Sequence, residues 1–109
     1  IFSGNNISST ATIGLQTADG IITEAATGDG PVNATYRAID RITGLPLKLS
    51  DYSIRSVTEG TDAIGEVTVK VEDKGHLVVG HGASIDIIEA SAKAYINAIN
   101  KVIHSQENA

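Results

Sequence analysis

Two short glycine-rich segments carry the clearest chemical signal in this sequence. They read Gly28-Asp29-Gly30-Pro31 and Gly80-His81-Gly82-Ala83, lie 52 positions apart, and each follows a predicted β-hairpin. A glycine-rich loop that leads into a helix exposes backbone N–H groups, and these can bind an anion. When either segment is taken alone, a sharp strand-to-helix turn is the better explanation of its glycines. Their repetition favours a shared role, in which two helix starts face one carboxylate-bearing ligand.

Neither segment is a nucleotide-binding motif. No Gly-Lys-Ser/Thr follows, as a Walker A loop requires, and the third glycine of a dinucleotide fingerprint is missing. Asp29 lies between the two glycines of the first segment, where a carboxylate can receive an ammonium group. Asp86 lies near the expected start of the second helix, and helix capping explains it without a ligand. Asp29 is therefore the stronger binding candidate of the two.

No set of residues in the sequence matches a catalytic or metal site. His76, His81 and His104 lack metal-ligand spacing and are expected on the surface or in turns. The chain has no cysteine, which excludes disulfides, thiol catalysis and thiolate metal sites. No Gly-x-Ser-x-Gly nucleophile elbow occurs. We therefore expect neither catalysis nor a cofactor in this chain.

The composition narrows the class of protein. A chain of 109 residues suits one domain, and 41% hydrophobic residues suffice for a core, which aliphatic side chains must fill because aromatic residues make up only 4%. Eight basic and thirteen acidic residues give a net charge of −5, which argues against a nucleic-acid partner. No apolar run approaches the roughly 20 residues that span a membrane, and the first ten residues do not resemble a signal peptide. These features fit a cytoplasmic protein, and the missing initiator methionine indicates a piece of a longer chain.

The first half of the chain has the pattern of a hairpin followed by a helix. Alternating apolar and polar residues over 11–17 predict a strand, the Asp-Gly pair at 19–20 predicts a tight turn, and 21–26 predicts the return strand. A helical pattern then begins at Pro31, a residue favoured in the first helical turn, and ends at Gly44. The two glycines of the first segment thus lie between strand and helix.

The second half repeats this pattern with an added extended segment. Residues 47–58 are expected to be extended, and the alternating valines of 66–72 predict the clearest strand of the chain. A turn at 73–75 leads to a pairing strand at 77–79. A second helix is expected over 84–103, with a serine N-cap at its first residue.

Together these elements predict an α+β fold made of two pseudo-repeated β-rich halves, each closed by one helix. The order is ββα and then βββα, with the helices packed on sheet. The domain is expected over residues 11–104, with 1–10 as a linker or frayed terminus and 105–109 as a frayed C-terminus. The second helix is apolar on more than one face, which indicates a homodimer or docking to another domain.

Three blocks of the sequence resemble the C-terminal regulatory domain of 2-isopropylmalate synthase. Residues 28–34 are similar to its first signature, 49–52 with 60–67 to its middle block, and 80–91 to its last block. The blocks occur in order and at the right spacing, and the match covers nearly the whole chain. This combination is specific to the superfamily of such regulatory domains.

The resemblance implies a role in regulation. Full-length members of this family condense acetyl-CoA with 2-oxoisovalerate, the first committed step of leucine biosynthesis, in an N-terminal TIM barrel that holds a divalent metal. That barrel is absent from this sequence, so the resemblance implies a non-catalytic piece that binds leucine and inhibits the distant active site. It also implies a homodimer with the amino acid at its interface, and the catalytic barrel as a further partner.

The resemblance also assigns effector contacts position by position. They fall in the first glycine-rich turn and helix start, in the extended segment, and in the second helix-entry loop: Gly28, Asp29, Gly30, Val32, Asn33, Leu49, Tyr52, Ser56, Ala83 and Ile85. One position departs from the pattern, because the family commonly has Asp where this chain has Asn33.

A zwitterionic aliphatic amino acid fits these residues chemically. Helix entries supply N–H donors for its carboxylate, and Asp29 or loop carbonyls suit its ammonium group. Val32, Leu49 and Tyr52 suit its branched side chain, whose burial contributes roughly 1.5–3 kcal/mol. Two alternatives stay open beside leucine: the regulatory domain of a citramalate synthase, which binds isoleucine, and a purely structural dimerisation module.

Overall fold

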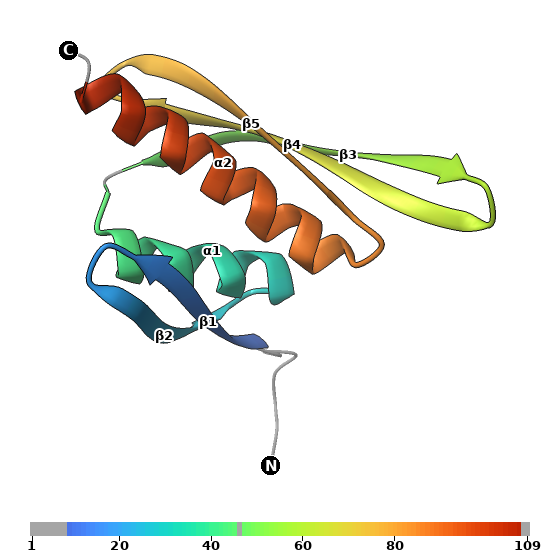
Figure 1. Cartoon of the computed structure of the whole chain (residues 1–109), viewed down its shortest axis with the longest axis horizontal. Coiled ribbons are helices and arrows are strands. Elements are labelled where there is room, and N and C mark those ends of the chain that lie inside the picture. Colours follow the sequence, from blue (N-terminus) through green and yellow to red (C-terminus); the bar gives the residue numbers. More distant parts are fainter. Residues whose placement is uncertain (1–8, 46, 108–109) are drawn as a thin grey trace, which may run out of the picture. The chain divides into compact units, whose positions relative to one another are not determined.

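The computed structural model describes residues 9–45 and 47–107, which form two compact units divided between residues 45 and 46. Each unit consists of one small antiparallel sheet and one helix (Figure 1). The element order is ββα followed by βββα, and the helices lie on the sheets. The predicted α+β fold with two pseudo-repeated halves is therefore confirmed.

The first unit is a hairpin with a helix packed on both of its strands. Its elements are β1 (Ser9–Thr17), β2 (Gly20–Gly28) and α1 (Pro31–Thr43). The Thr17 hydroxyl closes the hairpin turn, since it donates to the Gly20 carbonyl at 2.7 Å and accepts from the Asp19 N–H at 3.2 Å. The turn that the Asp-Gly pair predicted is confirmed.

Helix α1 begins and ends where the sequence predicts. Pro31 is its first residue, and it ends before Gly44, whose φ of 65° is a left-handed conformation that favours glycine. The Gly44 N–H donates to the Asp40 carbonyl at 2.8 Å. Near the same end, Arg41 Nη1 donates to the Ala25 carbonyl of β2 at 3.0 Å and so links the helix to the hairpin.

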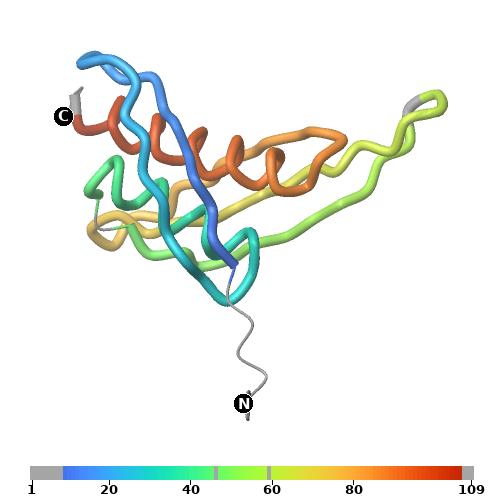
Figure 2. Tube along the Cα trace, turned by 90° about the horizontal axis from the view of Figure 1, so that it is seen from below, coloured from blue at the N-terminus to red at the C-terminus, as the bar shows by residue number. Residues whose placement is uncertain are grey.

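The second unit is a three-stranded sheet with the longer helix on one side. Its elements are β3 (Lys48–Glu59), β4 (Asp62–Asp73), β5 (His76–Ser84) and α2 (Ile87–Glu107). The strand order is β3-β4-β5, and α2 packs on β5 and β4. The turn end of the β3–β4 hairpin projects past the N-terminal end of α2 in both views (Figure 1, Figure 2). Helix α2 therefore covers only part of this sheet.

The side of the sheet that faces α2 is built from valines and glycines. Val67, Val69 and Val71 of β4 are buried. Gly82 and Gly80 of β5 lie directly opposite the first two of these valines, in the register of the two strands. A Cβ atom on Gly80 would meet the carbonyl oxygen of Ala94 and lie 2.7 Å from the Cβ of Ala98, and one on Gly82 would meet the backbone of α2 at Ala90 and Ala94. These glycines therefore permit close helix-to-sheet packing.

This packing corrects two predictions about the second glycine-rich segment. Strand β5 continues through Gly80 and Gly82 to Ser84, whereas the predicted strand ended at residue 79. Helix α2 begins at Ile87 and not at Ser84. The two helices thus start 56 positions apart, at residues 31 and 87, while the glycine segments are 52 apart. A strand glycine beneath a helix and a turn glycine before a helix look alike in sequence, which is why the prediction was wrong.

Asp86, rather than Ser84, caps α2. Its Oδ1 accepts hydrogen bonds from the backbone N–H groups of Ile88 at 2.9 Å and Glu89 at 3.4 Å. The Ser84 hydroxyl accepts from the Asp86 N–H at 3.2 Å. The capping role expected for Asp86 is confirmed, and the N-cap role expected for the serine is wrong.

The ends of the ordered elements extend into segments expected to be terminal. Strand β1 already begins at Ser9, and α2 continues to Glu107. The remainder of the predicted linker, residues 1–8, and of the predicted frayed C-terminus, residues 108–109, lies outside the described residues.

Candidate functional site

The glycine-rich turn of the first unit is held by the side chain of Asn33, which follows it at the start of α1. Oδ1 of Asn33 accepts from the Asp29 N–H at 3.1 Å, and the Ala34 N–H donates to the Gly30 carbonyl at 2.9 Å. Gly28 is buried at the end of β2, where a Cβ atom would lie 2.6 Å from the backbone nitrogen of Ala34. This glycine is therefore required by the close approach of strand and helix, and the loop after it is fixed.

The start of α1 offers hydrogen-bond donors and a positive helix end. Val32 and Asn33 follow the proline at the first helical position, and their N–H groups have no acceptor within the helix. The first turn of α1 contains no acidic residue that would compensate the helix dipole. Asp29 is exposed just before this helix start, and Val32 is half-buried. The arrangement suits a carboxylate at the helix start and a cationic group beside Asp29.

In the second unit, three predicted site residues share the helix-facing side of β3. Leu49 and Tyr52 lie opposite the buried valines Val71 and Val69, and Ser56 continues the same side toward the hairpin turn. The Tyr52 hydroxyl and the Ser91 hydroxyl of α2 are hydrogen-bonded at 2.6 Å. Leu49 remains 41% exposed because α2 packs on β4 and β5.

The two remaining predicted residues lie elsewhere in the second unit. Ala83 is opposite Glu66 in the strand register, which places it on the side of the sheet that faces away from α2 and from Tyr52. Ile85 lies between β5 and α2 and is 79% exposed. Both were assigned to a helix-entry loop, and the longer β5 gives Ala83 a strand position. The sheet therefore groups Leu49 and Tyr52 but separates them from Ala83.

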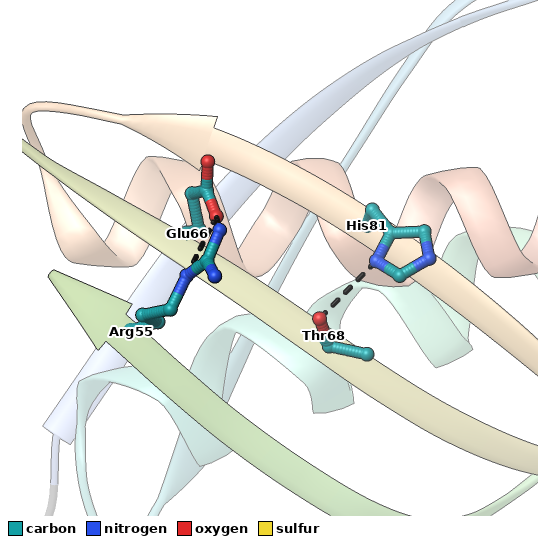
Figure 3. Close-up of polar contacts among 4 residues, drawn as sticks. All are labelled: Arg55, Glu66, Thr68 and His81. Carbon is teal, nitrogen blue, oxygen red and sulfur yellow. Dashed lines mark hydrogen bonds and ion pairs between the residues drawn. The ribbon is translucent and has the colours of Figure 1, made fainter. Parts of the chain in front are cut away.

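A polar cluster on the side away from α2 was not predicted from the sequence. Nη2 of Arg55 lies 2.6 Å from Oε2 of Glu66, and Oγ1 of Thr68 is hydrogen-bonded to Nδ1 of His81 at 3.1 Å (Figure 3). An open depression of about 400 Å³ lies over these strands, lined by Glu66, Val67, Thr68, His81, Gly82 and Ala83. Its polar groups come from three successive strands and pair over 11 and 13 positions, so the strand register is needed to find them.

The histidines of this chain lie at the surface and form no metal-binding group among the described residues. All three histidines are exposed, as expected for surface or turn residues. Within residues 9–45 and 47–107, no group of three or more His, Asp or Glu side chains could hold a metal ion. No helix in the same ranges is long and apolar enough to cross a membrane.

Comparison with known proteins gives a consistent match. The family model described as the LeuA allosteric (dimerisation) domain matches residues 1–103. The 2-isopropylmalate synthases of Ruminiclostridium cellulolyticum and Carboxydothermus hydrogenoformans are each 54% identical to this chain over 94% of its length, and that of Nostoc is 48% identical over 94%. The matched region is only 20%, 20% and 19% of these relatives, so the chain spans about a fifth of their length.

Proposed function

The chain belongs to the family of LeuA allosteric (dimerisation) domains of 2-isopropylmalate synthases, and from this premise we propose that it binds L-leucine and transmits feedback inhibition. The catalytic domain it regulates would condense acetyl-CoA with 2-oxoisovalerate. This chain itself is a small regulatory domain, and its described strands form two small open sheets rather than a barrel. We place it in a cytoplasmic homodimer, since its relatives are named as biosynthetic enzymes and its family as dimerising.

The observation that supports leucine binding most directly is the fixed turn at the start of α1. The N–H groups of Val32 and Asn33 can donate to a carboxylate, and the exposed Asp29 carboxylate can accept from an ammonium group. The hydrogen bond from Asp29 N–H to Asn33 Oδ1 holds both parts of this turn in place before a ligand arrives. A pre-formed turn binds more tightly because less conformational entropy is lost.

The apolar part of the proposal rests on Val32 in the first unit and on Leu49 and Tyr52 in the second. Val32 is half-buried beside the proposed charge-binding turn. Leu49 and Tyr52 provide an accessible apolar strip on β3, and Ser56 adds a hydroxyl further along it. Gly28 and Gly30 complete the turn. Ala83 and Ile85 are retained as proposed effector contacts on the family resemblance alone.

Calorimetric titration tests the proposal. We expect L-leucine to bind the dimeric chain, and Asp29→Ala to weaken this binding by about tenfold or more, since a charge-assisted hydrogen bond contributes roughly 1.5–3 kcal/mol. His81→Ala is the matched control, because His81 is an exposed residue in the second unit, bonded to Thr68 rather than to the turn.

Each outcome of the titration has a clear reading. Tighter binding of L-isoleucine than of L-leucine would replace the leucine proposal with regulation of the citramalate synthase type. No heat with leucine, isoleucine or valine in a dimeric sample would leave a structural dimerisation module. Equal effects of the two alanine variants would remove Asp29 from the site.

A further inference from the structure

The two outer strands of the second unit differ in how their edges are occupied. β5 carries α2 along its length, whereas β3 is hydrogen-bonded along one side only, to β4, in the part of the chain that the structure describes. An edge strand with open N–H and C=O groups is a template for pairing with another strand. The edges therefore show where a further strand can be added.

The edge of β5 that faces away from β4 is occupied by side chains of α2. The His81 N–H donates to Oδ1 of Asn97 at 3.0 Å, and Nζ of Lys101 donates to the Val79 carbonyl at 2.8 Å. These bonds also show that odd-numbered residues of β5 direct their backbone groups away from β4. Pairing groups alternate along antiparallel strands, so the register carries this alternation across the sheet to β3. On β3, from the bulge after Leu49 toward the hairpin turn, the outward groups belong to even-numbered residues such as Tyr52 and Ile54.

Strand β3 has the length and exposure of an edge strand that can pair with another chain. It is 12 residues long, contains no proline, and nearly all its described side chains are exposed on both sides of the sheet. Ile54, a β-branched residue, is 53% exposed. A bulge between Leu49 and Asp51 is its one irregularity. Long and partly apolar edges of this kind are rarely left unpaired.

We propose that β3 pairs antiparallel with β3 of a second copy of this chain, centred on Ser53, to form one continuous six-stranded sheet. In this register Asp51 lies opposite the partner's Arg55, and Tyr52 lies opposite the partner's Ile54. The proposal rests on the proposed function in its need for a dimer, and it goes further by naming the surface, the orientation and the register.

Charge complementarity selects this register. Within one chain, Arg55 lies opposite Glu66 and Asp51 lies opposite Lys70. Pairing centred on Ser53 joins these into two alternating rows, each running Glu66, Arg55, the partner's Asp51 and the partner's Lys70. Opposite charges on facing strands are stabilising and like charges are destabilising. Centring the pairing on residue 51 or 55 would instead place two aspartates or two arginines face to face.

The same register connects the dimer to the proposed effector residues. Tyr52 and the partner's Ile54 form a directly opposed pair on the side of the sheet that faces α2. Their backbone groups are the outward ones, so this pair exchanges the inter-chain hydrogen bonds. The apolar strip next to Tyr52 is therefore completed by the second copy, which gives the dimer a direct influence on that strip.

A charge-reversal experiment tests the register. In the proposed register, residue 51 of each copy faces residue 55 of the other, so the dimer contains two such pairs. Asp51→Arg turns both into arginine–arginine pairs, and Arg55→Asp turns both into aspartate–aspartate pairs. Each variant alone should raise the dimer dissociation constant in sedimentation by about tenfold or more. An equimolar mixture of the two variants restores opposite charges at both positions and should dimerise as the unmodified chain does.

The mixture isolates the inter-chain effect. Each variant also loses a favourable charge pair within its own sheet, and this loss is still present in the mixture. Glu72→Lys is the matched control. It reverses a charge on the same side of the sheet, opposite Lys48, but Glu72 lies on β4 and not on the pairing strand β3. The control should dimerise normally. Failure of the mixture to recover, or an equal effect of Glu72→Lys, would overturn the register.

A cross-link gives an independent test, since the chain has no cysteine of its own. Ser53 faces its own copy in a non-hydrogen-bonded pair, where the Cα atoms are about 4.5 Å apart, within the range of a disulfide. Ser53→Cys should therefore form a disulfide-linked dimer on mild oxidation. Thr58→Cys is the control, because the two copies of residue 58 would lie about 34 Å apart along the strands.

The result separates this proposal from the proposed function. A chain that dimerises and binds leucine but does not cross-link through Ser53→Cys would overturn the β3 pairing and leave the regulatory function standing. A chain that cross-links through Ser53→Cys but binds no branched-chain amino acid would support the pairing and overturn the leucine proposal. A monomeric chain would overturn the pairing.

Discussion

Gly82 and Gly30 are residues of the same type in similar sequence surroundings, yet they meet different neighbours. A Cβ atom on Gly82 would meet the backbone of α2 at Ala90 and Ala94 and would lie 2.8 Å from the Cβ of Lys93. A Cβ atom on Gly30 would have no heavy atom within 4 Å, and its φ of −161° is extended backbone open to any residue. Gly82 is therefore needed for packing, whereas Gly30 is not.

Substitution by alanine should separate these two roles. Gly82→Ala is expected to destabilise the chain by about 1–3 kcal/mol, because overpacking forces α2 away from the sheet. Gly30→Ala should change the free energy of unfolding by less than about 0.5 kcal/mol. Urea denaturation followed by circular dichroism measures both. Equal stability of the two variants would contradict the packing role of Gly82.

The predicted site residues show which contacts can be predicted from the type of a residue and its near neighbours in sequence. Asp29 and Asn33 were chosen by chemistry and resemblance, and the structure joins them by a hydrogen bond across the turn. The link between Thr68 and His81 was missed, since the two lie 13 positions apart and neither belongs to a motif. Local chemistry can be predicted from sequence, while cross-strand neighbours depend on a register that the sequence alone did not define.

At the scale of elements, the start of α2 depends on one carboxylate. Asp86 accepts from two N–H groups of the first turn, which otherwise lack an acceptor. Asp86→Ala should therefore cost about 1 kcal/mol in the free energy of unfolding. Ser84→Ala is the comparison, because Ser84 accepts only from the Asp86 N–H and should cost less. Thermal denaturation of both variants checks the order, and a larger loss for Ser84→Ala would reverse the assignment of the cap.

Sequence patterns located α1 more accurately than α2 for a physical reason. Pro31 cannot continue a strand and Gly44 adopts a left-handed conformation, so both ends of α1 carry a local signal. The boundary between β5 and α2 has no proline, and Ser84 and Asp86 are both residue types that favour an N-cap. Gly80 and Gly82 interrupt the apolar pattern of β5, but the cause is contact with a helix that follows later in the chain. A local pattern cannot represent this tertiary contact.

At the scale of the whole molecule, leucine binding should appear as stability. A ligand that binds only the folded state raises the free energy of unfolding by about 2.7 kcal/mol at a hundred times its dissociation constant. Thermal unfolding should therefore shift to higher temperature with L-leucine, and L-lysine is the control with the same zwitterion but a charged side chain. A midpoint that does not move at saturating leucine would contradict leucine binding.

The same shift should be lost in Asp29→Ala at the concentration that stabilises the unmodified chain. The chain divides into two compact units, so the data should also be examined for two transitions. If only the transition of the first unit moved, the helix-start residues would be the main contacts. If both transitions moved together, the ligand would stabilise both units.

The blocked edge of β5 has a consequence for how far assembly can proceed. A sheet with two open edges can add chains at both ends without limit, which is the geometry of a fibre. Asn97 and Lys101 occupy the β5 edge of the three-stranded sheet, so among its described strands β3 is the edge left for pairing. Two chains joined through β3 then present a blocked edge at each end, and growth stops at two. In the proposed dimer, two polar side chains on one helix thus limit the growth of this sheet to two chains.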